Sequence, residues 1–157
     1  MRAAVLTVSD RASVGTMTDE SGPAVRRLLA QAGFEVSDVV VVPDERERIS
    51  EFLVEAAATH DLVVTTGGTG LGPRDVTPQA TRPLLDYEVP GLAELMRAEG
   101  LRKTPMAALS RSLAGVRGRT LIVNLPGSVR GATESLEAIV PVLRHALGLV
   151  AGDTRHA

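Results

Sequence analysis

The sequence of 157 residues has no cysteine and no tryptophan, and its only aromatic residues are one tyrosine and two phenylalanines. The absence of cysteine excludes a disulfide, a thiol nucleophile and a cysteine-ligated zinc site. Because aromatic side chains are scarce, valine, leucine, isoleucine and alanine must build the core. A chain of this length is typical of one domain with a sizeable core. We therefore expect a single domain over residues 1–157, with a polar tail at 152–157.

The chain also lacks an excess of one charge, since 17 basic residues stand against 19 acidic ones and are spread along the sequence. Nucleic-acid-binding proteins usually carry a basic face, and single-strand binders add stacking aromatics. No apolar run approaches the length of a bilayer span, and the first apolar stretch is too short for a signal peptide. We predict a cytoplasmic protein that binds neither nucleic acid nor membrane.

Short apolar runs that stop at polar or glycine-bearing loops alternate with helical patterns along the chain. Runs rich in Val, Ile and Leu are typical of strands buried on both faces of a parallel sheet, and they occupy residues 3–9, 39–42, 62–66 and 121–125. Helices are expected at residues 21–32, 46–59, 77–87, 91–100 and 132–150. This alternation predicts an α/β fold of right-handed βαβ units. A hairpin from 112–116 to 120–124 would make the sheet mixed.

The most distinctive segment is residues 65–78, in which four glycines fall within six positions beside two threonines. In a doubly wound sheet, such a loop lies at the edge where ligands bind. Its amides, its threonine hydroxyls and the start of the next helix, with Thr77 as N-cap and Pro78 at N1, can cradle a phosphate. A P-loop or a dinucleotide fingerprint is excluded because Pro73 stands where lysine or a third glycine is needed. A flexible turn is the alternative.

Two aspartates, Asp44 and Asp75, follow strand ends at the same expected edge. Magnesium is commonly held by one or two carboxylates plus the phosphates of a substrate, so both are candidate ligands. Taken singly, each can instead form an Asx turn or a cap, and Asp10 can simply end the first strand. The histidines have no partner at metal-ligand spacing and are expected to be structural or solvated: His60, His145 and His156. Because no serine-triad motif occurs either, the loops predict a phosphate-bearing ligand but no particular reaction.

Residues 66–70 together with 73–78 resemble the hallmark of the molybdenum cofactor biosynthesis family of Mog and MoaB proteins. That family includes the molybdopterin adenylyltransferases and the G domain of gephyrin. Further segments resemble the family in the same order, at residues 8–11, 19–23, 42–44, 90–91, 108–111 and 124–128. The resemblance implies a molybdopterin-binding fold, a three-layer αβα sandwich with a mostly parallel mixed sheet.

The same resemblance implies a Mg²⁺-dependent reaction of ATP. The terminal phosphate of molybdopterin attacks the α-phosphorus of ATP, giving adenylyl-molybdopterin and pyrophosphate. The residues that match catalytic and metal-positioning residues of the family are Asp44 and Asp75. Those that match the nucleotide-binding loop are Thr66, Gly67, Gly68, Thr69 and Gly70. Those that match molybdopterin-binding segments are Asp10, Ser110, Pro126, Gly127 and Ser128.

The resemblance further implies a homotrimer or a hexamer, with other molybdenum cofactor biosynthesis proteins as potential partners. Two alternatives to the adenylyltransferase stay open at this point. One is a non-catalytic molybdopterin-binding or assembly protein of the same family. The other is a different nucleotide-processing enzyme on a similar fold.

Overall fold

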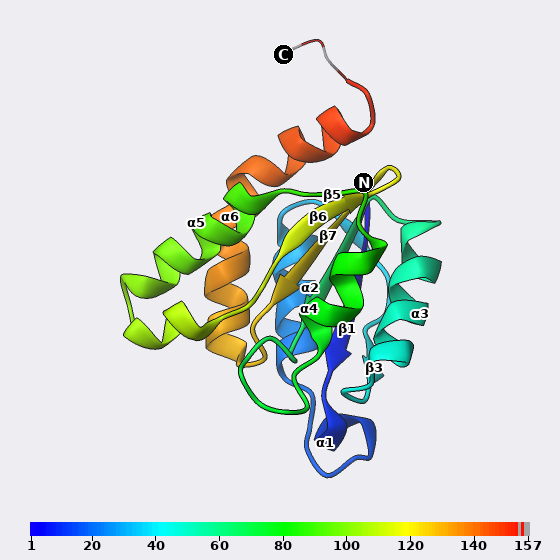
Figure 1. The fold of residues 1–157 in the computed structure, drawn as a ribbon. Helices are drawn as coiled ribbons and strands as arrows, with labels where there is room; N and C mark the ends of the chain where they lie inside the picture. The colour runs from blue at the N-terminus through cyan, green and yellow to red at the C-terminus, as the bar shows by residue number, and fades with distance from the viewer. Residues whose placement is uncertain (154, 156–157) are drawn as a thin grey trace.

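A computed structural model describes residues 1–153 and 155, and in this range one sheet carries helices on both faces (Figure 1). The strands are β1 (Arg2–Val8), β2 (Glu35–Val36), β3 (Val40–Val42), β4 (Leu62–Thr66), β5 (Tyr87–Glu88), β6 (Ala114–Arg117) and β7 (Thr120–Leu125). The α-helices are α1 (Asp10–Ser13), α2 (Ser21–Gln31), α3 (Arg46–Ala57), α4 (Thr77–Thr81), α5 (Pro90–Leu101) and α6 (Val129–Val150). Two 3₁₀ helices are η1 (Arg82–Leu84) and η2 (Pro105–Leu109). His156 and part of the predicted tail lie outside the described residues.

The sheet is mixed and mostly parallel, as the sequence predicts. Within the described residues it has seven strands, six of them in the order β2-β1-β4-β7-β6-β5. The seventh, β3, pairs with the last residues of β1, whereas β2 pairs with the first. β1, β2, β3, β4 and β7 are parallel, whereas β6 runs antiparallel to both of its neighbours, β7 and the edge strand β5. The carboxyl ends of β1, β3, β4 and β7 therefore point to the same edge, the lower one in Figure 1.

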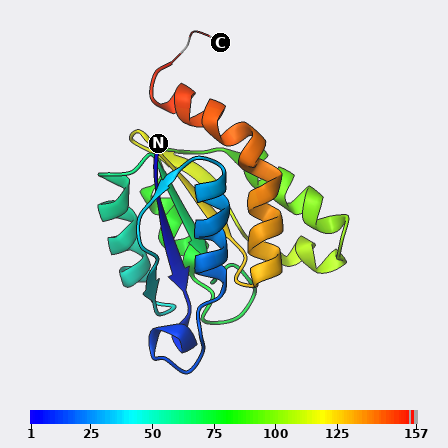
Figure 2. The same ribbon diagram turned by 180° about the vertical axis from the view of Figure 1, so that it is seen from behind.

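Successive side chains of a strand point to opposite faces of the sheet, so the buried strands contribute to a core on each face. Helices cover both cores, which gives three layers. In β1, Ala3 and Val5 face a core shared with α2, α5 and α6, whereas Ala4 and Leu6 face a second core against α3 and α4. Figure 2 shows α2 and α6 side by side over the first of these faces. Phe34 is the one aromatic residue buried among those described, so the core is aliphatic as expected.

The segment predicted as one helix over residues 77–87 is the main error at the level of secondary structure. α4 ends at Thr81, the chain continues as η1, and β5 then pairs with β6. Pro83 explains the early end, because proline has no backbone N–H and so cannot donate the α-helical hydrogen bond to the carbonyl of Gln79, four residues earlier. The elements α1, β2, β5 and η2 were not predicted because each is too short to show a periodicity.

The last helix, α6, begins at Val129 rather than at the predicted residue 132. The Ser128 side chain accepts a hydrogen bond of 3.0 Å from the Gly131 N–H and so caps the helix. Pro141 lies inside α6, which bends along its length in Figure 2. Among the described residues, no helix has both the length and the apolar character that a membrane crossing requires.

Candidate functional site

The loops at the carboxyl edge of the sheet surround a cleft of about 890 Å³. The loop after β1, the residues after β3, the glycine-rich loop after β4 and the turn between β7 and α6 all contribute to its walls. Its lining includes eight of the residues singled out from the sequence: Asp10, Asp44, Thr66, Gly67, Gly68, Asp75, Gly127 and Ser128. Parallel strands thus bring together side chains that are far apart in the sequence.

A second hollow of about 360 Å³ adjoins the cleft and lies against α5 and η2. Its walls carry the apolar side chains of Met96, Met106 and Leu109. The other predicted site residues line this hollow: Thr69, Gly70, Ser110 and Pro126. Because Gly127 and Ser128 line both spaces, the β7–α6 turn forms their common wall.

The backbone of the glycine-rich loop requires glycine at two positions. Gly67 and Gly68 have φ of +101° and +69°, values that other residues rarely adopt. A Cβ at Gly67 would collide with the carbonyl oxygen of Val8, and one at Gly68 would collide with the Thr77 hydroxyl. Gly70 has an ordinary φ instead, and a Cβ there would lie 3.0 Å from Asp75 Oδ2. Its small size therefore makes room for the Asp75 carboxylate.

The sequence assigns the threonine hydroxyls of the loop and the helix start to an anion, but the hydroxyls of Thr66 and Thr77 form hydrogen bonds inside the protein. The buried Thr77 is not the N-cap, since α4 is preceded by Val76 in that position. Its hydroxyl donates to the Gly67 carbonyl at 2.9 Å and its N–H to the Gly68 carbonyl at 3.1 Å. The Thr66 hydroxyl donates to the Pro126 carbonyl at 2.7 Å. Among the described residues, the backbone amides of residues 68–71 have no hydrogen-bond acceptor, and together with the Thr69 hydroxyl they are left to contact an anion.

Asp10 and Asp44 join the ends of β1 and β3 by two reciprocal hydrogen bonds. The Asp10 N–H donates to Asp44 Oδ2 at 2.8 Å, and the Asp44 N–H donates to Asp10 Oδ1 at 2.9 Å. Arg74 donates to both carboxylate oxygens of Asp10, each at 2.9 Å. These hydrogen bonds from Arg74 are the main reason why the pKa of Asp10 lies below its ordinary value. Asp10 therefore does more than end the first strand, because it ties Arg74 of the glycine-rich loop to β3.

Asp44 is partly buried and lies near two other carboxylates, whose charges are offset only in part by Arg74. Burial raises the pKa of the Asp44 carboxyl, and the negative charges of Asp10 and Asp75 raise it further, although the hydrogen bond from the Asp10 N–H acts the other way. Asp75 lines the same cleft, and its Oδ2 accepts a hydrogen bond of 2.9 Å from the Gly72 N–H.

A search for groups of three or more Asp, Glu, His or Cys able to hold a metal finds none in the part of the chain that the structure describes. Magnesium does not need such a group, because one or two carboxylates and the phosphates of a substrate commonly complete its coordination. The carboxylates of Asp44 and Asp75, which line the same cleft and act on one another electrostatically, fit that pattern. The donor set would not fit zinc, which takes three or four protein ligands.

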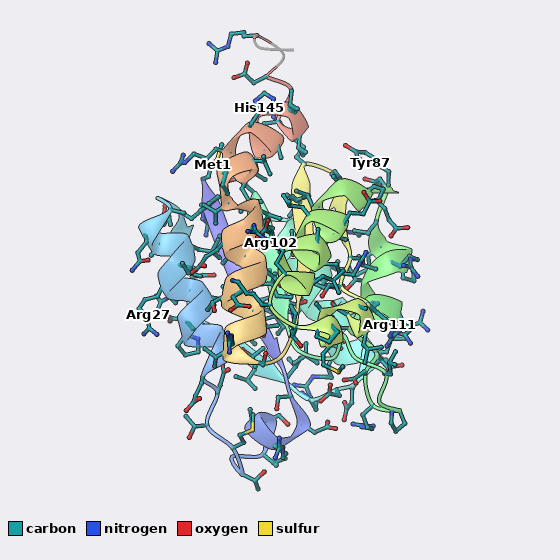
Figure 3. The ribbon with its side chains drawn as sticks, turned by 90° about the vertical axis from the view of Figure 1, so that its left-hand side faces the viewer. Met1, Arg27, Tyr87, Arg102, Arg111 and His145 are labelled. Atoms are coloured by element: carbon teal, nitrogen blue, oxygen red, sulfur yellow. The ribbon has the colours of Figure 1, made fainter. Side chains whose placement is uncertain are left out.

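Arg111 holds the glycine-rich loop of the site, although it received no role from the sequence. Its Nε donates to the Gly70 carbonyl and its Nη2 to the Asp75 carbonyl, both at 2.8 Å. Figure 3 shows Arg111 among the loops on the side of the molecule away from Arg27 of α2. Because these partners lie 41 and 36 positions earlier in the chain, no local pattern could have revealed the contacts.

Residues 4–145 match the family described as a probable molybdopterin binding domain. The chain belongs to this molybdopterin-binding family. Its match to a Helicobacter pylori molybdopterin adenylyltransferase is 41% identical over 153 residues, covering 95% of this chain and 87% of that protein. The match to gephyrin of Dictyostelium discoideum is 43% identical and covers 93% of this chain but 22% of gephyrin.

Solved structures of the molybdopterin-binding family have the same fold. The molybdopterin biosynthesis enzyme MoaB of Thermus thermophilus is 61% identical, with a TM-score of 0.91 over 96% of both chains. These matches confirm the Mog and MoaB family and the three-layer α/β fold predicted from the sequence. The roles of the individual site residues stay predictions.

Proposed function

We propose that this protein is an ATP-dependent molybdopterin adenylyltransferase of molybdenum cofactor biosynthesis. A phosphate oxygen of molybdopterin forms a bond to the α-phosphorus of ATP, the bond from that phosphorus to the bridging oxygen of the β-phosphate breaks, and pyrophosphate leaves. The observation that carries the proposal is the cleft in which the glycine-rich loop, at Gly67 and Gly68, meets the carboxylates of Asp44 and Asp75, while Thr69 and Gly70 line the adjoining hollow. Support also comes from relatives about two-fifths identical that are named molybdopterin adenylyltransferase.

Adenylyl transfer from ATP requires positioning of the phosphates and neutralisation of their charge rather than a covalent nucleophile, and different residues of the site would supply each. In the proposed arrangement the glycine-rich loop holds the phosphates of ATP with its amides. Asp44 and Asp75 would hold Mg²⁺, which supplies positive charge to the reacting phosphates when bound. Asp10, Ser110 and the β7–α6 turn would orient molybdopterin, because they line the cleft and the adjoining hollow.

A second candidate is a molybdopterin-binding or assembly protein without catalysis. The match to one part of the much longer gephyrin supports it, because such a domain can serve within a larger protein. This candidate predicts that molybdopterin binds but no pyrophosphate is released. The presence of both aspartates in the cleft favours the enzyme.

We further propose that the protein is a cytoplasmic homotrimer, with a hexamer as the variant, and that it works beside other cofactor biosynthesis proteins. Support for assembly comes from large apolar side chains at the surface, among which Val14, Leu71 and Met106 are 73%, 67% and 63% exposed. Closed cyclic symmetry would bury the same patch on every subunit.

The proposal is tested by pyrophosphate release from ATP in the presence of molybdopterin and Mg²⁺. Wild-type protein should release pyrophosphate only when molybdopterin is present, whereas Asp44→Asn and Asp75→Asn should each reduce the rate by about 100-fold or more. Asp61→Asn is the matched control, because Asp61 accepts a hydrogen bond from the Arg2 N–H away from both hollows. Molybdopterin binding without turnover would favour the second candidate. Rates of pyrophosphate release equal to that of wild-type protein in all variants would contradict the roles assigned to Asp44 and Asp75.

A further inference from the structure

Arg111 connects two segments of the site that are far apart in the sequence. Its own backbone N–H donates to the Thr69 carbonyl at 2.9 Å, so the main chain beside Ser110 is already attached to the glycine-rich loop. The guanidinium then reaches along the loop to the carbonyls of Gly70 and Asp75. Its Nη1 donates to Gln79 Oε1 at 3.1 Å. One side chain thus contacts the loop on both sides of its exposed middle.

The segment that carries Arg111 is itself held from the other side. Arg97 of α5 donates from Nη1 to the Ser112 carbonyl at 2.8 Å and more weakly to the Ser110 carbonyl at 3.4 Å. α5 is anchored in the core through the buried side chains of Leu92 and Met96. Arg111 therefore connects the glycine-rich loop to a segment that α5 holds in place.

The loop between residues 70 and 75 needs such support. Gly70 and Gly72 have no side chains to pack, and Leu71 between them is 67% exposed. Glycine-rich backbone loses more conformational freedom on ordering than other sequences do. Arginine suits the task because its planar fork can donate to several carbonyls at once, whereas the ammonium of lysine is a single point.

We propose that Arg111 is a positioning residue, which holds the Asp75 carboxylate and the amides of the glycine-rich loop in the arrangement that binds the nucleotide phosphates. Arg111 acts through the loop carbonyls and needs no contact with substrate. The inference rests on the proposed function for its effect on turnover, but its effect on the loop is independent of that function. A misplacement of about 1 Å in a reacting group can reduce a rate by about 100-fold.

The test compares Arg111→Gln and Arg111→Lys with wild-type protein and with Arg117→Gln. Arg117 is the matched control, because it is also half-buried and donates to a backbone carbonyl, but that carbonyl belongs to Leu84 of η1, at 3.0 Å, and not to the glycine-rich loop. Amide hydrogen exchange over residues 68–77 measures the order of the loop. Calorimetry with Mg²⁺ and ATP measures nucleotide binding, and pyrophosphate release measures kcat.

Both Arg111 variants should exchange faster in residues 68–77 than wild-type protein, with exchange in the strands of the sheet unchanged. We expect kcat to fall about 10- to 100-fold, with weaker ATP binding, and Arg111→Lys should not restore it because charge alone cannot replace the fork. Arg117→Gln should match wild-type protein in all three measurements.

Exchange and kcat equal to those of the control would overturn the positioning role, as would full rescue by lysine. If wild-type protein releases no pyrophosphate, the proposed function fails. Faster loop exchange with weaker ATP binding in the Arg111 variants would still support the positioning role, and unchanged exchange would overturn it. If Arg111→Gln does not fold, Arg111→Lys decides by the same criteria.

Discussion

Asp44→Asn should separate the stability of the protein from its activity. The asparagine side chain has nearly the shape of aspartate and keeps an oxygen that can accept the 2.8 Å hydrogen bond from the Asp10 N–H. What the substitution removes is one negative charge from a partly buried position beside Asp10 and Asp75, where burial and both neighbours raise the pKa of the carboxyl. The folded state therefore loses repulsion and loses no hydrogen bond.

The magnitudes follow from these two facts. Interactions between partly exposed charges contribute about 0.2–1 kcal/mol each, so the free energy of unfolding should stay equal or rise by up to about 1 kcal/mol. In a protein of this size that corresponds to an increase in Tm of at most about 4 °C. Turnover should instead fall by about 100- to 1000-fold, the usual effect of losing one well-placed electrostatic group.

Thermal unfolding in metal-free buffer and pyrophosphate release at saturating Mg²⁺ measure the two effects on the same preparation. Because the pKa of Asp44 is raised in the folded state, its ionised form destabilises the wild-type protein fully above that pKa. The Tm difference between the two proteins should therefore close as the pH falls through the raised pKa to the ordinary aspartate value. A variant with near-normal turnover, or one that loses several kcal/mol of stability, would refute the reasoning.

Three further predictions concern the loop and the assembly. Gly68→Val should weaken ATP binding by calorimetry, because φ is +69° and a Cβ would meet the Thr77 hydroxyl; Gly118→Val, at a positive φ with open space around it, is the control and should bind ATP normally. Thr77→Val should lower the free energy of unfolding by about 1–3 kcal/mol in urea, since it leaves the buried Gly67 carbonyl unpaired; no change would contradict the contact. Light scattering should give a trimer or a hexamer at micromolar concentration, and a monomer would refute the assembly.

The buried strands were predictable because their burial on both faces leaves continuous runs of Val, Ile and Leu. The helices were predictable where amphipathic periodicity extended over several turns, as in α2 and α3. Residues 77–88 were not, because the start of a helix, a proline and a two-residue edge strand follow one another too closely for any one pattern. Pairing with β6 defines β5, and that contact is long-range.

The gathering of the candidate residues that follow parallel strands was predictable from the strand pattern, whereas Ser110 was predicted only from the family resemblance. The structure places all of the candidate residues around two adjoining hollows. Their hydrogen-bond partners were not predictable. Thr77 has the sequence context of an N-cap, yet its hydroxyl holds the Gly67 carbonyl. Arg74 and Arg111 received no role of their own from the sequence, yet one holds Asp10 and the other holds backbone carbonyls of the loop. Such contacts depend on tertiary structure, which carries no local signature.

The central claim is adenylyl transfer to molybdopterin, and the fate of labelled phosphate tests it most directly. Wild-type protein would be mixed with molybdopterin, Mg²⁺ and ATP labelled in either the α- or the γ-phosphate, and the products separated. The account predicts that the α-label appears in adenylyl-molybdopterin and the γ-label in an equal amount of pyrophosphate. Label that stays in ATP while molybdopterin is bound, or a γ-label released as inorganic phosphate, would contradict it.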